Sequence, residues 1–103
     1  MIQVIAIITT KPGQREAVLA AFRANIPAVH AEDGCIEYTP VIDVPNGGAI
    51  QTPLGPDGFM VVEKWESAAH LQAHATSAHM ASYGAKVKDL LASRVIHVLS
   101  PLA

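Results

Sequence analysis

Residues 2–10, Ile-Gln-Val-Ile-Ala-Ile-Ile-Thr-Thr, form the segment that most restricts how this chain can fold. β-Branched residues predominate, and no breaker interrupts them before Lys11-Pro12-Gly13, so the segment predicts a β-strand. Both faces of that strand carry apolar side chains: Ile2, Val4, Ala6 and Ile8 on one, Ile5 and Ile7 on the other. We therefore expect both sides of the strand to be covered.

The next two segments predict a helix and a second strand. Over residues 14–32 the apolar side chains recur at helical spacing, as Val18, Phe22, Ile26 and Val29. Pro27 should kink or shorten this helix, and Asp33-Gly34 should end it. Residues 35–43 alternate Ile36 and Tyr38 with Glu37 and Thr39, and Pro40 indicates a bulge or an edge position.

Residues 44–58 hold four of the seven glycines and three of the seven prolines, which predicts a long loop with a short extended piece at 49–51. A loop of this length is usually functional. It could be an arm that reaches a partner chain or a lid over a pocket.

The second half of the chain repeats the order of strand, helix and strand. Residues 59–66 predict a strand, and Ser67 is a suitable N-cap for a helix over 68–75. Ser77 can cap a further helix over 78–92, with apolar residues at Met80, Tyr83, Val87 and Leu90, and residues 94–100 predict the last strand.

This order predicts an α+β, ferredoxin-like split βαβ fold, in which helices cover one face of a four-stranded antiparallel sheet. The length of 103 residues suits a single domain over 1–103. The other sheet face would remain an apolar patch too large for a monomer to expose. We therefore expect a homodimer that packs this face against a second copy.

Composition narrows the range of partners and locations. The net charge is −2 and the seven Lys and Arg residues are scattered, so no nucleic acid is expected as a partner. Cys35 is the only cysteine, which favours a reducing compartment. The N-terminus lacks a basic signal region and reaches Lys11 too early to span a membrane, so we expect a cytoplasmic protein.

Glu63 and Trp65 are candidate site residues on the third predicted strand. Glu63 lies on an apolar face between Val61 and Trp65, where burial would raise the pKa of its carboxyl group. It could act as a general base or substrate anchor, or it could pair with Arg94 or Lys11. Trp65 could seal the core or form the floor of a pocket.

Three histidines follow within ten residues. His70 and His74 lie four apart and share a helix face, whereas His79 lies beyond a break at Thr76-Ser77. They could act in acid–base chemistry, remain polar surface residues, or bind a metal, but the His-Glu-x-x-His pattern is absent and no metal is expected. We expect His30 and His97 to be structural. No motif for a flavin, nicotinamide or nucleotide is present.

Several segments, taken in order, resemble the antibiotic biosynthesis monooxygenase domain family, and in particular its bacterial quinol monooxygenases. They are Glu63-Lys64-Trp65-Glu66-Ser67-Ala68-Ala69-His70-Leu71, Ala73-His74, Ser77-Ala78-His79-Met80, Ala81-Ser82-Tyr83 and Glu32-Asp33-Gly34-Cys35-Ile36-Glu37-Tyr38. The resemblance extends over nearly the whole chain and includes the glycine-rich loop.

The resemblance implies a dimeric α+β barrel that oxidises quinols or polyphenols with O₂ and without flavin, haem or metal. It implies His74 or His79 as the base, Glu63 or Tyr83 as the orienting group, and Trp65 as the pocket wall. Trp65, Tyr83 and His70 are then the expected substrate-binding residues. Haem-degrading relatives use an Asn on the first strand, and residues 2–10 contain none. Two alternatives stay open: an isomerase of a phosphorylated signalling sugar, and a non-catalytic dimer that binds aromatic ligands.

Overall fold

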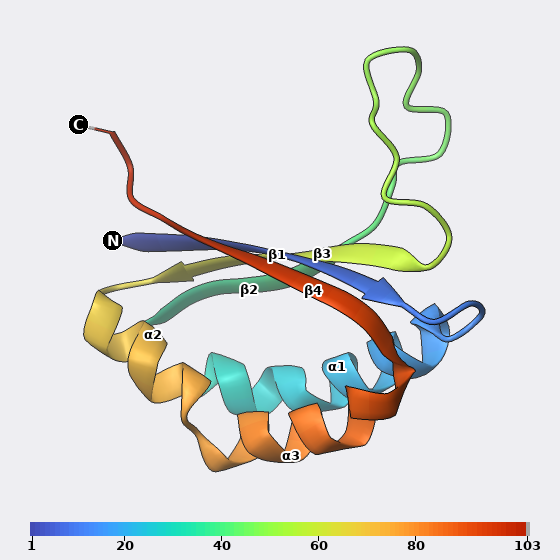
Figure 1. The fold of residues 1–103 in the computed structure, drawn as a ribbon. Coiled ribbons are helices and arrows are strands. Elements are labelled where there is room, and N and C mark those ends of the chain that lie inside the picture. Colours follow the sequence, from blue (N-terminus) through green and yellow to red (C-terminus); the bar gives the residue numbers. More distant parts are fainter. Residues whose placement is uncertain (103) are drawn as a thin grey trace.

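The computed structural model describes residues 1–102, which build one antiparallel sheet with helices packed on one of its faces (Figure 1). The elements, in chain order, are β1 (Ile2–Thr10), α1 (Arg15–His30), β2 (Cys35–Val41), β3 (Gly58–Trp65), α2 (Ala68–Ala75), α3 (Ala78–Val87), a 3₁₀ turn (Lys88–Leu90) and β4 (Leu91–Leu99). The four strands lie in the order β2-β3-β1-β4, so the predicted ferredoxin-like α+β fold is confirmed. No helix in residues 1–102 is long and apolar enough to cross a bilayer.

The two apolar faces of β1 have different surroundings. Val4, Ala6 and Ile8 point toward the helices and are buried in the core. Ile5 and Ile7 lie on the opposite face and are half-buried, because no helix of this chain covers that side (Figure 1). We call the side away from the helices the outer face of the sheet.

Helix α1 continues through Pro27 and ends at His30, so the proline does not stop the helix. Pro27 lies in the last turn and has no backbone N–H, so the helical hydrogen bond to the Arg23 carbonyl is missing there. Its carbonyl still accepts from the Ala31 amide at 3.1 Å. Phe22 and Val29 are buried as the periodicity predicted.

Strand β2 is an edge strand, as Pro40 indicated, but its irregularity lies elsewhere. The pairing with β3 shifts between Cys35 and Glu37, which leaves Ile36 as an extra residue. The prediction that Ile36 and Tyr38 share one face of the strand is therefore wrong: Ile36 is 53% exposed, whereas Tyr38 is 4% exposed.

The loop between β2 and β3 rises as an arm from the outer face (Figure 1). Its base is closed by Asp43, whose carboxylate accepts the amides of Leu54 at 2.8 Å and Gly55 at 3.0 Å. These backbone hydrogen bonds hold the pKa of the Asp43 carboxyl below its usual value. The extended piece predicted at 49–51 is instead a turn, in which the Gln51 amide donates to the Gly48 carbonyl at 3.2 Å.

Ser67 and Ser77 cap α2 and α3 as predicted, by accepting the amides of His70 and Met80. The Ser77 hydroxyl also donates to the His74 carbonyl at 2.8 Å, so it closes the end of one helix and the start of the next. The break that separates His74 from His79 is thus held by one side chain.

Helix α3 ends at Val87 rather than at residue 92, and β4 begins at Leu91 rather than at 94. The Lys11 amide donates to the Leu90 carbonyl at 2.8 Å, and Leu91 pairs with Thr10. Pairing with β1 therefore outcompetes helix propagation at this point.

Candidate active site

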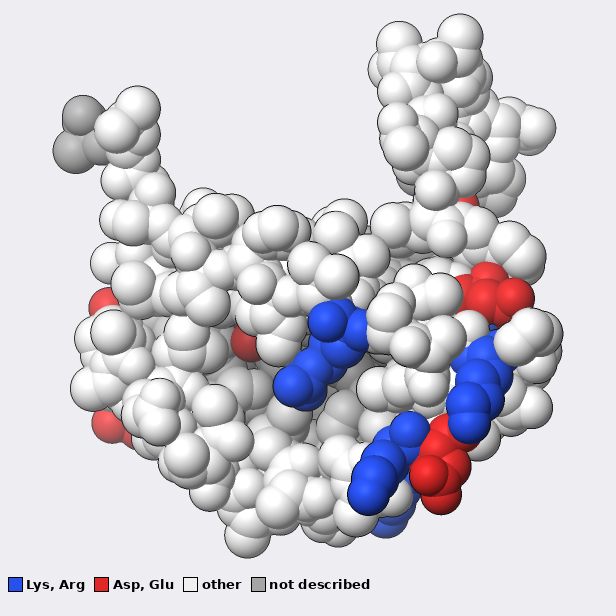
Figure 2. Space-filling view, viewed as in Figure 1, with Lys and Arg blue, Asp and Glu red and all other residues white. Residues whose placement is uncertain are grey.

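A cavity of about 440 Å³ lies between the helix-facing side of the sheet and helices α2 and α3. Apolar side chains form much of its wall, among them Val4, Val61, Leu71, Met80, Ile96 and Val98. Its polar groups are few and include Glu63, His74, Tyr38, Tyr83, Gln72 and Arg94. Figure 2 shows that the front of the molecule is hollowed below β4, with a blue Lys or Arg side chain beside the hollow. A cavity of this size with few polar groups suits a small, mostly apolar ligand.

Glu63 is buried on the helix-facing side of β3, as its place between Val61 and Trp65 predicted. The Trp65 indole N–H donates to Glu63 Oε1 at 3.0 Å, and His74 Nε2 lies 3.9 Å from the same oxygen. Burial raises the pKa of the Glu63 carboxyl group, and the indole hydrogen bond and His74 offset part of this shift. Among the described residues, its ion-pair partner is His74 rather than Arg94 or Lys11.

His74 lies in the last turn of α2 and is buried between two carboxylates. Its Nδ1 atom is 2.8 Å from Glu32 Oε2, while Nε2 faces Glu63. When Nδ1 donates its hydrogen to the Glu32 carboxylate, Nε2 is the ring nitrogen that can accept a proton. The imidazole therefore presents a proton acceptor beside Glu63 at the cavity wall.

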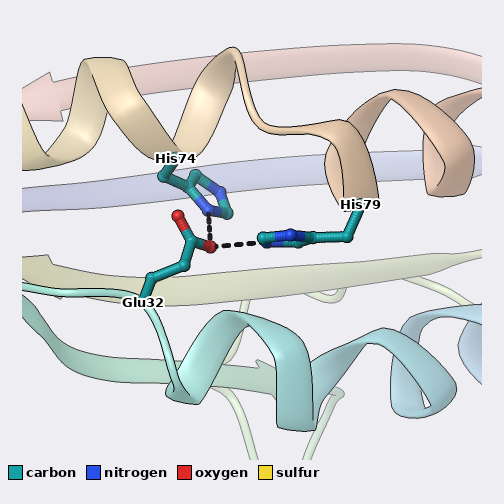
Figure 3. A group of neighbouring side chains, drawn as sticks. All are labelled: Glu32, His74 and His79. Carbon is teal, nitrogen blue, oxygen red and sulfur yellow. Dashed lines mark hydrogen bonds and ion pairs between the residues drawn. The ribbon is translucent and has the colours of Figure 1, made fainter.

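Glu32 joins His74 to His79 (Figure 3). His79 Nε2 lies 2.8 Å from the same Oε2 atom and 3.2 Å from the Ser77 hydroxyl. The donor atoms of the three residues lie within 4.8 Å of one another, and two His with a carboxylate are a set that zinc accepts. The two 2.8 Å hydrogen bonds already satisfy all three atoms, so we describe the group as a hydrogen-bonded triad.

Tyr83 lines the cavity, as expected for an orienting group. Its ring packs edge-on against Phe22, with 5.8 Å between ring centroids. Burial raises the pKa of Tyr83 to about 12, with Arg94 opposing the shift. At neutral pH its hydroxyl is therefore a hydrogen-bond donor and not a base.

Trp65 and His70 lie outside the cavity wall. Trp65 is fully buried, and its ring lies behind His74, with 4.5 Å between centroids. His70 Nδ1 lies 2.7 Å from the Ser67 hydroxyl, and its ring packs on the turn at Gly34. Trp65 therefore contacts the site through Glu63 and His74, and His70 contributes to the start of α2.

Glu32 and Tyr38 are the site residues that the residue patterns missed. Tyr38 lines the cavity, stacks on Phe22 and contacts the His74 ring, with 5.4 Å between centroids. Burial and the nearby Glu63 raise the pKa of Tyr38. The available signal was the segment 32–38, which belongs to the resemblance but carries no periodic pattern pointing to a site.

Comparison with known proteins shows the family to which the chain belongs. The family model described as antibiotic biosynthesis monooxygenase matches residues 1–86. The chain is 42% identical to "Probable quinol monooxygenase YgiN" of Escherichia coli K12, over 98% of each chain.

Solved structures match the fold over almost the full length. That of PA3566 from Pseudomonas aeruginosa gives a TM-score of 0.82 at 28% identity, covering 99% of this chain and 94% of that one. That of Rv0793 from Mycobacterium tuberculosis gives 0.80 at 30% identity, covering 99% and 95%. The chain belongs to the antibiotic biosynthesis monooxygenase family.

Proposed function

We propose that this protein is a cofactor-independent monooxygenase that oxidises quinols or related polyphenols with O₂. The observation that carries the proposal is the position of His74, which lines the cavity with Nε2 beside the buried Glu63 while Nδ1 is held by Glu32. The relative named "Probable quinol monooxygenase YgiN" supports the substrate class.

The chemistry begins with ionisation of the substrate. A phenol with a pKa of about 10 is ionised to about one part in a thousand at pH 7, so the site must supply roughly 4 kcal/mol. His74 Nε2 accepts the phenolic proton, and Glu32 stabilises the resulting imidazolium. The Arg94 guanidinium and the Tyr83 hydroxyl at the cavity wall stabilise the phenolate oxygen.

The phenolate then transfers one electron to O₂, and the semiquinone and superoxide recombine to form a carbon–oxygen bond. The peroxide so formed takes up one proton in place of the one that left the substrate, and cleavage of the O–O bond then leaves one oxygen on the ring and releases the other as water. The overall balance is QH₂ + O₂ → hydroxyquinone + H₂O, in which the quinol supplies all four electrons that reduce O₂. The apolar wall keeps water from the radical pair.

We also infer that the protein works as a homodimer through the outer face of the sheet. Ile5, Ile7, Val62 and Val95 lie on this face, and Val95 is 47% exposed. The same face also carries the ion pair between Lys64 Nζ and Glu37 Oε1, which lie 3.6 Å apart. An apolar face of this extent favours burial against a second copy.

The test is quinol-dependent O₂ uptake by protein that has been dialysed against EDTA. We expect rates above buffer autoxidation for a panel of benzo- and naphthoquinols. His74→Gln should lower kcat by about 10²-fold, whereas His30→Gln, on an exposed residue at the end of α1, should not.

Rates no higher than autoxidation, or activity that returns only with added metal, would contradict the proposal. Anaerobic turnover of a phosphorylated keto-sugar would indicate the isomerase. Quenching of Trp65 fluorescence by a naphthoquinone without turnover would indicate a binding protein.

A further inference from the structure

We propose that Glu32 and His79 form a proton relay that carries the substrate's proton from His74 to a second hollow, between α1 and α3. This inference rests on the proposed function, because His74 must first remove a proton in the cavity. It gives a role to Glu32 and His79, which do not line the cavity, and it gives the proton an exit route.

The second hollow is lined by Ala21, Ala24, Asn25, His79, Ser82, Tyr83 and Lys86. Its volume of about 100 Å³ has room for roughly three water molecules. His79 lines this hollow but not the cavity, whereas His74 lines the cavity but not the hollow. Glu32 is the group that bonds to both (Figure 3).

Exposure increases in steps along this path. The side chains of His74, Glu32 and His79 are 6%, 13% and 29% exposed, respectively. The path thus leads from a buried imidazole to one that meets solvent, through two 2.8 Å contacts to a single oxygen. A ligand that fills the cavity would displace the water there, so this side route becomes the available exit.

Each step breaks one bond to hydrogen and forms another. The substrate O–H proton moves to His74 Nε2, and the Nδ1 proton of the same ring moves to Glu32 Oε2. At rest His79 Nε2–H donates to Glu32, and exchange with solvent moves this hydrogen to Nδ1 of the exposed ring. Glu32 then passes its proton to the bare Nε2, and His79 releases its Nδ1 proton to water in the hollow. When the peroxide takes the Nε2 proton of His74, the same steps run inward and return a proton to Nδ1, so both rings regain their starting tautomers.

The groups around the path determine where along it a positive charge is stable. His74 is faced by Glu63, Glu32 and the Tyr38 and Trp65 rings, so positive charge is stabilised at the inner end. His79 is faced by Glu32 and the Ser77 hydroxyl, and the Lys86 ammonium group and Asn25 line its hollow. Lys86 disfavours a second positive charge at the outer end.

The first test measures the proton that is released when 1-naphthol binds under argon. Stopped flow with a pH indicator records this release. The amplitude reports ionisation in the cavity, and the rate reports the exit route. His79→Gln keeps a donor for Glu32 but cannot relay, so we expect an unchanged amplitude and a release about 10²-fold slower. Added imidazole should restore the rate, and His30→Gln should behave as wild type. An unchanged rate, or a slow rate that imidazole does not restore, would overturn the relay.

The second test needs no substrate and so separates the relay from the proposed function. Solvent exchange of the His74 ring N–H is measured by ¹⁵N NMR in unliganded protein, with folding checked by circular dichroism. We expect slower exchange in His79→Gln and wild-type exchange in His30→Gln. Relay-dependent exchange without naphthol-induced proton release would refute the proposed base step and keep the relay. Identical exchange in all three proteins would refute the relay.

Discussion

The Nδ1 atom of His74 lies 2.8 Å from a carboxylate oxygen of Glu32, although 42 positions separate the two residues in the chain. The contact joins the turn after α1 to the last turn of α2. The hydrogen bond that leaves His74 Nε2 free therefore depends on tertiary structure.

Glu32→Gln should lower kcat for quinol oxidation by about 10²-fold with little change in KM. The amide can no longer stabilise an imidazolium at His74, yet it leaves the cavity wall intact. Steady-state O₂ uptake measures the effect. Asp33→Asn changes the neighbouring exposed carboxylate, which pairs with His70, and should retain activity. Equal losses in both variants would contradict a specific role for Glu32.

Trp65→Phe should destabilise the fold by about 1–3 kcal/mol, because it leaves Glu63 without its indole donor and leaves part of the indole's space empty. Urea unfolding gives the free energy. The double variant with Glu63→Gln tests the coupling, since the loss should be smaller once the carboxylate is gone. Strict additivity of the two changes would argue against this hydrogen bond as the cause.

Glu63→Gln should raise stability at neutral pH relative to wild type. Because the pKa of Glu63 is raised in the folded state, the native protein binds more protons than the unfolded chain above the ordinary value of about 4.5. Its contribution is therefore present below pH 4.5 and is lost as the pH rises through the raised value. The difference between variant and wild type should grow between pH 5 and 8 in urea unfolding. A constant difference over that range would contradict the raised pKa.

Asp43→Ala should release the base of the arm without changing the cavity. The two amides that the carboxylate accepts, those of Leu54 and Gly55, should exchange faster with deuterium, and limited proteolysis should cut within 42–57 sooner. Asp57→Ala, which removes a contact to the Gly13 amide at the β1–α1 turn, serves as the matched control. Protection that is unchanged at Leu54 would show that Asp43 does not hold the arm.

Val95→Lys should dissociate the proposed dimer and leave the chain folded, because this half-exposed side chain lies on the outer face beside Ile7. Sedimentation should give twice the chain mass of 10.9 kDa for wild type and a single chain mass for the variant. Ala85→Lys, on the exposed side of α3, should remain a dimer. A wild-type mass near 10.9 kDa would refute the dimer itself.

Local signals predicted the fold well where a single side chain decides the outcome. Ser67 defined the start of α2 because its hydroxyl satisfies the amide of His70. The end of α3 was harder to predict, because Leu90 and Leu91 suit a helix stripe and a strand equally. Pairing with Thr10 of β1 decided between them, and no local pattern contains that information.

The candidate site was predictable only in part, for the same reason. Glu63 could be placed on an apolar face from the alternation of β3, and it is buried there. Ile36 could not be placed, because the bulge in β2 depends on its register with β3. Glu32 lies in the turn after α1, outside the periodic pattern of that helix. Its contacts with two histidines therefore arise from how α1, α2 and α3 meet.

The interruption between α2 and α3 has a geometric consequence for His74 and His79. Side chains five positions apart on one continuous helix point in directions about 140° apart and cannot converge on a single atom. The bend held by Ser77 cancels this divergence and brings both rings to one oxygen of Glu32. A spacing that regular helix geometry forbids becomes usable because one hydroxyl ends the first helix and starts the second.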